Sequence, residues 1–345
     1  TGVSPGSCVE DLFQYRLTNR ASVVRASSGS RYFPVPLGRI IPEIRSASPS
    51  ERIAIVGLPC MLKGLRLAAE VFPDLKEKVC FTLGLTCNHL PNRYYTEYLS
   101  RLSGIDPDDL ARADYRIKEG TKRAGRFHFR ALGQDGKPGK TIPFSGRVSQ
   151  AWGFGYFQLN PCNYCDDIFA ETADACFMDA WLPEFERDPR GHTMMVVRNG
   201  VLNRILEKGI EEGTCFLEMV PVERVAASQQ ALIFEKKVLT RGRLHGALAR
   251  GEAVPRKRVT PSLAVYITHR REIERKRTVQ DFTKRLWPRY RHTALWPFYV
   301  RVMEKSGFLI FLSWRSRLKR AVKEPRLLFR PFRINKGPSR RQKSA

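Results

Sequence analysis

The segment Arg52-Ile-Ala-Ile-Val-Gly-Leu-Pro-Cys-Met-Leu-Lys-Gly-Leu-Arg-Leu-Ala-Ala-Glu-Val71 decides the fold class of this chain. Residues 52–57 form a short apolar run that ends in glycine, which is typical of a buried strand. Over residues 61–71 the apolar side chains recur at helical spacing, so we expect a helix that starts just after Cys60. The segment therefore predicts a strand, a loop that carries a cysteine, and a helix.

A second unit of the same kind follows at residues 79–102. Val79-Cys-Phe-Thr-Leu-Gly-Leu85 has the pattern of another buried strand, Cys87 comes directly after it, and a helix is expected at 93–102. Cys60 and Cys87 thus each follow the carboxyl end of a strand. Open α/β sheets place their functional sites at that end of their strands.

The pattern changes beyond residue 113. Three short segments alternate apolar and polar residues between glycine-containing turns, which predicts antiparallel strands at 114–120, 126–130 and 140–144. Further strands are expected at 175–178 and 193–197, and a helix at 202–209.

The predicted fold class is α/β of mixed α+β type, with strand–loop–helix units on a mixed sheet, an antiparallel section and a basic C-terminal extension. We divide the chain into four regions: a lead-in at 1–26, an α/β part at 27–112, a mixed strand and helix part at 113–234, and the extension at 235–345.

Almost all of the net charge lies in the extension. The whole chain has a formal charge of +26. From Glu235 to the end there are 31 Lys and Arg against 7 Asp and Glu, whereas residues 1–234 hold 29 against 27. Aromatic residues alternate with the basic clusters, a combination that suits nucleic acid or an anionic membrane surface. Because no nucleic-acid-binding motif accompanies it, we expect an anionic membrane surface, an acidic partner or a solvated tail rather than specific nucleic-acid binding.

The sequences at the two ends of the chain give information about its location in the cell. Phe308-Leu-Ile-Phe-Leu-Ser-Trp314 is too short to span a bilayer but could lie in its surface as an interfacial helix. The chain opens without the charged and apolar segments of a signal peptide, and Thr1 in place of Met suggests a truncated start. Since unpaired cysteines are typical of reducing compartments, we expect a cytoplasmic protein that can associate peripherally with a membrane.

Eight cysteines are present, and Cys162 and Cys165 form a C-x-x-C pair. Such a pair brings two sulfurs to one point and forms half of a four-thiolate site. With Cys60 and Cys87 the spacing becomes C-x26-C-x74-C-x2-C. Structural zinc usually takes two short pairs and a thioredoxin-like pair opens a helix in a small domain, whereas iron–sulfur clusters accept scattered ligands. The spacing favours a cluster and leaves zinc as an alternative.

The other four cysteines are expected to be structural. Cys80, Cys176 and Cys215 each stand among apolar residues and resemble small hydrophobic side chains on strands, whereas no pattern surrounds Cys8. A disulfide framework is not expected in a long chain with a core of its own.

Several short motifs occur in the order known from one protein family. They are Gly57-Leu-Pro-Cys60, Gly84-Leu-Thr-Cys87-Asn-His89, Tyr115-Arg-Ile-Lys-Glu-Gly120, Cys162-Asn-Tyr-Cys165-Asp-Asp167, Ala173-Asp174 and Asp179-Ala-Trp181. Through them residues 27–225 resemble the coenzyme F420 hydrogenase/dehydrogenase beta-subunit family. That family includes the F420-reducing hydrogenase beta subunit, formate dehydrogenase beta subunits and plant hydroxymethyl-chlorophyll reductase. Ser28-Gly-Ser-Arg-Tyr32 is also similar to its Gly-Ser-Lys-Tyr motif.

The resemblance implies a flavoprotein that holds FAD and a 4Fe–4S cluster. Such a protein passes electrons between the one-electron cluster and a two-electron hydride carrier, because a flavin can accept a hydride and release electrons singly. The implied cluster ligands are Cys60, Cys87, Cys162 and Cys165. The implied partners are an electron-donor or acceptor protein, either ferredoxin-like or a partner subunit, with coenzyme F420 as one candidate substrate.

Further residues are candidates for contacts to the flavin. Gly57 lies just before an expected helix, whose N-terminal amides suit a flavin phosphate. Gly29, Ser30, Arg31 and Lys118 are candidates for the same role. His89, beside Cys87, is a candidate proton donor or cluster-tuning residue.

Two other functions stay open at this point. The first is a zinc-stabilised, non-enzymatic basic protein that docks on nucleic acid or on a membrane-associated assembly. The second is a family member that keeps the fold without the flavin. Many relatives also carry a ferredoxin-type segment rich in C-x-x-C-x-x-C, and these 345 residues have none, so their cysteines account for one cluster.

Overall fold

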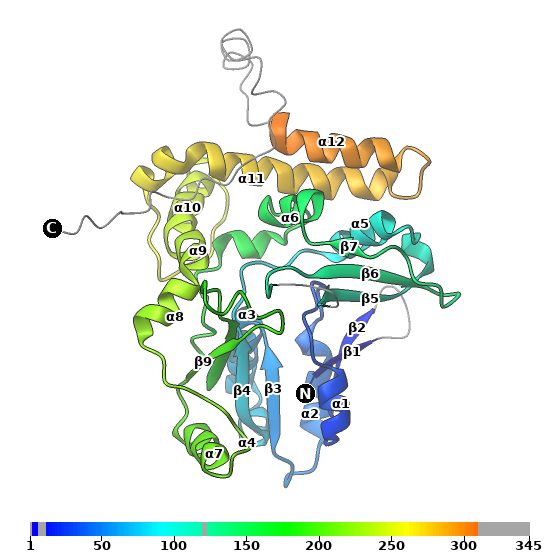
Figure 1. The fold of residues 1–345 in the computed structure, drawn as a ribbon. Coiled ribbons are helices and arrows are strands. Elements are labelled where there is room, and N and C mark those ends of the chain that lie inside the picture. Colours follow the sequence, from blue (N-terminus) through cyan, green and yellow to red (C-terminus); the bar gives the residue numbers. More distant parts are fainter. Residues whose placement is uncertain (1, 6–11, 119–122, 310–345) are drawn as a thin grey trace, which may run out of the picture.

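A computed structural model describes residues 2–5, 12–118 and 123–309 of the chain. In Figure 1 a central sheet occupies the lower half of the molecule, an antiparallel sheet lies above it, and two long helices run across the top. The predicted mixed α+β class, with a mixed sheet and a separate antiparallel section, is confirmed.

The central sheet has four strands in the order β3-β4-β8-β9. Its strands are β3 (Ile53–Gly57), β4 (Val79–Leu85), β8 (Ala175–Asp179) and β9 (Thr193–Val197). The first three are parallel and β9 is antiparallel to β8. All four were predicted from apolar runs. Gly84 on β4 packs against Ala170 so closely that any side chain at this position would collide with the Ala170 Cβ.

Three helices are connected to the first two strands of the central sheet. They are α3 (Pro59–Val71), α4 (Pro73–Lys78) and α5 (Arg93–Ser103). The prediction that the first helix starts after Cys60 is wrong, because Pro59 takes the first helical position and Cys60 falls in the first turn. Proline suits that position, since its missing N–H would have no partner there anyway. The predicted helix at 93–102 is confirmed; Asn92 caps it by accepting from the Tyr94 N–H.

The predicted antiparallel strands are also confirmed where the structure describes them; residues 119–120 of the first lie outside the described residues. They form a three-stranded sheet of β5 (Leu110–Ile117), β6 (His128–Gly133) and β7 (Ile142–Pro143) in that order. Short elements surround the two sheets: β1 (Gly2–Pro5), β2 (Phe13–Arg16), α1 (Ala21–Ala26), η1 (Leu37–Ile40), α2 (Ile41–Ser46), η2 (Pro107–Asp109), α6 (Gly146–Gly153), η3 (Asn160–Tyr164) and α7 (Gly200–Glu211). The last of these confirms the helix predicted at 202–209.

The extension folds back onto the rest of the molecule as far as residue 309. Its elements and the helices leading into them are α8 (Val222–Ser228), α9 (Gln230–Ile233), the π-helical turn η4 (Phe234–Leu239), α10 (Thr240–Ala249), α11 (Leu263–Tyr290) and α12 (Trp296–Leu309). Residues 310–314 of the candidate interfacial segment lie outside the described residues. No helix in the described part of the chain combines the length and apolar character needed to cross a bilayer.

Two apolar cores flank the space between the sheets. One packs the central sheet against α2 and α3, and includes Ile44, Ile55 and Leu62. The other joins α5 and the antiparallel sheet to the extension, and includes Tyr98 and Val279. The extension therefore belongs to a hydrophobic core that it shares with the α/β part.

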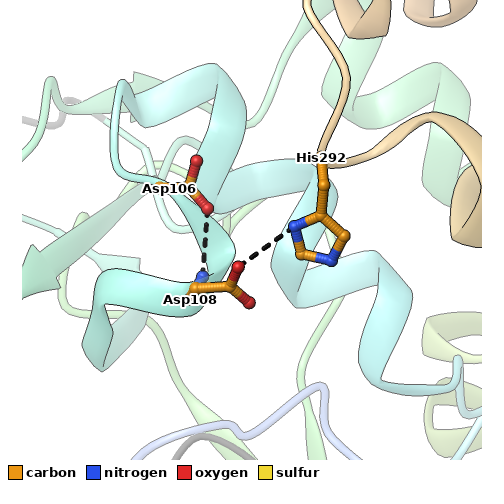
Figure 2. A group of neighbouring side chains, drawn as sticks. All are labelled: Asp106, Asp108 and His292. Atoms are coloured by element: carbon orange, nitrogen blue, oxygen red, sulfur yellow. Dashed lines mark hydrogen bonds and ion pairs between the residues drawn. The ribbon is translucent and has the colours of Figure 1, made fainter.

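Polar contacts fix the connection between α11 and α12 on the end of α5. Figure 2 shows His292 facing Asp108, and its Nδ1 lies 3.1 Å from the Asp108 Oδ2. Asp106 accepts from the Asp108 N–H and pairs with Arg101, whose guanidinium also donates to the Arg291 carbonyl. This exposed cluster anchors the turn between the two long helices.

Truncating the Trp287 side chain tests whether the extension is part of the cooperative unit. Its indole is 2% exposed, and its N–H donates to the Glu97 carboxylate on α5 over 2.9 Å. We expect Trp287→Ala to lower the free energy of unfolding by about 3–5 kcal/mol, measured by urea unfolding followed by circular dichroism. Phe298→Ala is the control, because that ring is 61% exposed and its loss should change the free energy by less than about 0.5 kcal/mol. Equal urea midpoints for W287A and wild type would show that the extension is not part of the cooperative unit.

Candidate functional site

The four cysteines predicted as ligands meet at the carboxyl edge of the central sheet. Cys60 lies in the first turn of α3, Cys87 follows β4, Cys162 lies in η3 and Cys165 comes directly after it. The thiols interact electrostatically with one another: Cys60 and Cys162 each with Cys165, and Cys87 with all three others. Segments up to about a hundred residues apart in the chain thus bring their sulfurs to one place.

Burial shapes the chemistry of these thiols. It raises the pKa of Cys60 and of Cys162, and it raises the pKa of Cys87 to about 12. The neighbouring sulfurs raise these pKa values further, and the Lys236 ammonium lowers them. Protonated thiols in this position can become ligands only when a bound cation supplies the charge that displaces their protons. A metal centre has that effect.

Two donors point at the sulfurs of the pair. The Leu90 N–H lies 3.4 Å from the Cys162 Sγ. The Lys236 Nζ lies 3.3 Å from the Cys165 Sγ and donates to the Asp167 carbonyl over 2.7 Å. Hydrogen bonds to sulfur stabilise a thiolate ligand and tune the metal that it holds.

The remaining cysteines lie apart from this site. Cys176 is fully buried on β8, as predicted for a small core residue. Cys80 lies on β4 but is exposed, at the point where the register between β3 and β4 shifts, so its predicted packing role is wrong. Cys215 is half-buried in the turn after α7 and not on a strand as predicted, and its sulfur packs against Gly209. Cys8 lies outside the described residues.

A cavity of about 570 Å³ opens beside the cysteines, between the central and antiparallel sheets. Cys87 and His89 line it on the side of the cysteine site. Six aromatic residues also line it: Tyr32, Phe127, Phe144, Trp152, Phe177 and Trp181. The Trp152 ring centre lies 4.6 Å from that of Tyr32 and 4.2 Å from that of His89. A cavity with these walls suits a planar aromatic ligand.

Two arginines, Arg31 and Arg116, and the carboxylate of Asp179 line one side of the cavity. The Arg116 guanidinium donates to both carboxylate oxygens of Asp179, over 2.9 and 3.0 Å, and to the Ser30 hydroxyl over 3.3 Å. Arg116 has a φ of 56°, a left-handed conformation that is unfavourable for a residue with a side chain and is often found at functional sites. Among the described residues, the Nε atoms of Arg31 and Arg116 are buried without a hydrogen-bond partner. Guanidinium groups placed in this way suit a phosphate.

Comparison with known proteins identifies the family. Residues 50–223 match the model for the C terminus of the beta subunit in the coenzyme F420 hydrogenase/dehydrogenase family. The chain belongs to this family. A chain of the F420-reducing [NiFe] hydrogenase complex from Methanosarcina barkeri has a similar fold, with a TM-score of 0.51 and 16% identity over 74% of this chain and 81% of that chain. No curated protein matches by sequence.

Membership of the F420 hydrogenase/dehydrogenase beta-subunit family confirms the resemblance drawn from the motifs. It also identifies the chain as a redox protein of the oxidoreductase class, and it does not favour the zinc-stabilised, non-enzymatic alternative. The matched residues include all four candidate ligands, but they leave out the Ser28–Tyr32 motif and the whole extension.

The candidate flavin contacts fall into two groups. Ser30 and Arg31 line the cavity, and Gly29 precedes them with a φ of 109° that glycine adopts without strain. Gly57 does not line the cavity and packs against Leu62, although its neighbour Leu58 does line it. Lys118 is also absent from the cavity wall, and its Nζ donates to the Arg190 carbonyl over 2.6 Å.

His89 lies between the two parts of the site. It lines both the large cavity and a small polar one of about 20 Å³ that also reaches Cys162. Burial, together with the charge of Lys276, lowers the pKa of His89 to about 3. The imidazole is therefore neutral at pH 7, with an N–H rather than an imidazolium proton to donate.

Sequence reasoning missed three residues that shape the site. Lys236 lies in the extension, 71 residues after Cys165, and nothing in its local pattern indicates a ligand contact. Glu235 beside it was counted only as part of a charged tail. Arg116 belongs to a recognised motif, but only its left-handed backbone and its pairing with Asp179 reveal its place in the cavity.

Proposed function

We propose that the chain is a flavin- and iron–sulfur-dependent oxidoreductase that passes electrons between a 4Fe–4S cluster and a hydride-type carrier or substrate. The observation that carries this proposal is the position of Cys87. This residue belongs to the group of four cysteines and also lines the large aromatic cavity. A cluster on the cysteines and a flavin in the cavity would therefore be neighbours.

The cysteine spacing supports a cluster over a single zinc ion. Four thiolates at about 2.3 Å from one zinc would lie about 3.8 Å from one another. In the described part of the chain, one group of three His, Cys, Asp or Glu has its ligand atoms within 4.8 Å of one another, and it is Asp106, Asp108 and His292 on the surface. The cysteines combine one short pair with two scattered residues, a spacing that iron–sulfur clusters accept.

The cavity supports a flavin dinucleotide. Its volume of about 570 Å³ lies in the range of cofactor sites, and its aromatic walls suit an isoalloxazine ring. Arg31 and Arg116 line the cavity, and their guanidinium groups could donate to phosphate oxygens. We therefore assign FAD to this cavity and the phosphate contacts to its arginine side.

The roles of the protein groups follow from these positions. When bound, FAD supplies the conversion between hydride transfer and single-electron transfer. Tyr32 and Trp152 would hold a planar ring by stacking, and Arg31 and Arg116 would fix the phosphate end. His89, neutral at pH 7, would offer a hydrogen bond between the cavity and the cysteines. Cys60, Cys87, Cys162 and Cys165 would hold the cluster.

The partners are proposed by analogy with the structural relative. That relative is part of an F420-reducing [NiFe] hydrogenase complex. We infer that this chain also exchanges electrons with a partner subunit or a ferredoxin-like protein, and that coenzyme F420 is one candidate hydride carrier. Docking of the basic extension on an anionic membrane surface or an acidic partner stays a prediction, as does the cytoplasmic location.

Anaerobic purification of the full chain tests the proposal. We expect about four iron and four sulfide per chain with about one FAD, and a visible spectrum that contains both chromophores. Metal content is measured by elemental analysis, sulfide colorimetrically, and flavin by its absorption after release from the protein. Stoichiometric zinc without a visible chromophore would contradict the proposal, and a cluster without flavin would support the flavin-free alternative.

A further inference from the structure

The cysteine site is covered by a segment that lies beyond the part of the chain matched by the family. The π-helical turn η4 brings Lys236 over Cys165, and this lysine is 2% exposed. Its ammonium contacts the Cys165 Sγ and the Asp167 carbonyl, and no carboxylate of the described residues lies within ion-pair distance of it. π-helical turns are rare and frequently occur at functional sites.

A buried ammonium is costly unless an anion compensates it. The Cys165 sulfur lies 3.3 Å from this ammonium, and the Asp167 carboxylate also interacts with it electrostatically. A thiolate bound to a metal centre at the Cys165 position would add a negative charge in direct contact with the lysine. The lysine and the cysteine site therefore complement each other electrostatically.

Further cations surround Lys236 from two helices. Lys276 of α11 and Arg243 of α10 both pair with Glu235, over 2.8 and 2.6 Å. The Arg243 guanidinium also donates to the Asn163 carbonyl, between the two cysteines of the pair, over 2.8 Å. These four side chains line the small polar cavity together with Cys162 and His89. Of the charged side chains that line this small cavity, three are cations and one is a carboxylate, so the lining has a net positive charge.

We propose that Lys236 is the residue of the extension that sets the reduction potential of the cluster. The proposal rests on the proposed function. A one-electron reduction makes a thiolate-bound cluster more negative, so a nearby positive charge and an N–H···S bond stabilise the reduced form and raise the potential. The carboxylate of Glu235 partly opposes this effect and holds Lys276 and Arg243 in place.

Redox titration of the full chain, followed by electron paramagnetic resonance, tests this role. The variants are Lys236→Met, which removes the charge at similar size, and Glu235→Gln, which removes the opposing carboxylate. The control is Lys237→Met, because that neighbouring lysine pairs with Glu171 and is 37% exposed. Iron and sulfide are measured on every sample, and circular dichroism establishes folding.

We expect K236M to lower the equilibrium constant for reduction about tenfold, which is a shift of about 59 mV to more negative potential. E235Q should shift the potential in the opposite direction, and K237M should stay at the wild-type value because solvent screens its charge. A wild-type potential in a folded K236M that keeps its iron and sulfide would overturn the proposal. If K236M does not fold or loses its iron, Lys236→Gln takes its place, and a wild-type potential in K236Q would overturn the proposal in the same way. Wild-type protein without iron and sulfide would instead overturn the proposed function itself.

Discussion

Replacing both cysteines of the pair, in the variant C162S/C165S, is expected to abolish iron and sulfide binding and the visible absorption that a cluster gives. The pair supplies two of the four thiolates in one short segment, and a serine hydroxyl is far harder to deprotonate than a thiol. The two remaining candidates, Cys60 and Cys87, come from different loops and cannot hold a cluster alone. Iron and sulfide per chain, measured after anaerobic reconstitution, should fall from about four each to near zero.

The chain offers a matched control for this change. The variant C80S/C215S carries the same two substitutions outside the site, on an exposed position of β4 and in the turn after α7. It should retain wild-type iron and sulfide. Wild-type iron and sulfide in C162S/C165S, or their loss in C80S/C215S, would refute the assignment of ligands. Loss of zinc rather than iron from the first variant would move the assignment to a structural zinc site.

The sequence predicted the sheet strands well because each carries a strong local pattern. The run at 52–57 is apolar and short, and β3 buries alternate residues along its length as such a run implies. The start of α3 was missed by two residues because proline was treated as part of the loop, whereas it fits the first helical turn. β1 and β2 carry no comparable pattern, and they were not predicted.

The extension was harder to predict because its apolar residues are outnumbered. In α11 the buried Ile273, Val279 and Trp287 are separated by many basic residues, so the whole segment resembles a solvated tail. Its docking depends on partners such as Glu97, which lies 190 residues earlier in the chain. Local periodicity contains no information about a contact of that kind.

The same reason explains which site residues could be predicted. Four cysteines can be found from spacing and motifs because few residue types serve as cluster ligands. Lys236 is one of many lysines, and its contact with Cys165 spans 71 residues of sequence. Arg116 and Asp179 form their pair across 63 residues. A basic residue becomes recognisable as part of a site only when the fold brings it to a buried position.

Arg116 is the residue on which we expect flavin binding to depend most. Arg116 lines the cavity, and a charge-assisted hydrogen bond from a guanidinium to a phosphate contributes about 1.5–3 kcal/mol. Arg116→Gln should therefore weaken FAD binding about 10- to 100-fold, and the purified protein should contain much less flavin than wild type. The affinity is measured by titrating flavin-free protein with FAD and following the flavin fluorescence.

A second arginine of β5 provides the control for this variant. Arg112 is exposed and pairs with Asp114 at the surface, so Arg112→Gln should bind FAD like wild type. R116Q should keep its iron and sulfide, because the cysteine site is built from other segments. Loss of iron together with flavin would indicate that the Arg116–Asp179 pair supports the fold instead. Wild-type FAD affinity in R116Q would refute the assignment of the phosphate contact to Arg116. The left-handed backbone of Arg116 would then be explained by its pairing with Asp179 alone.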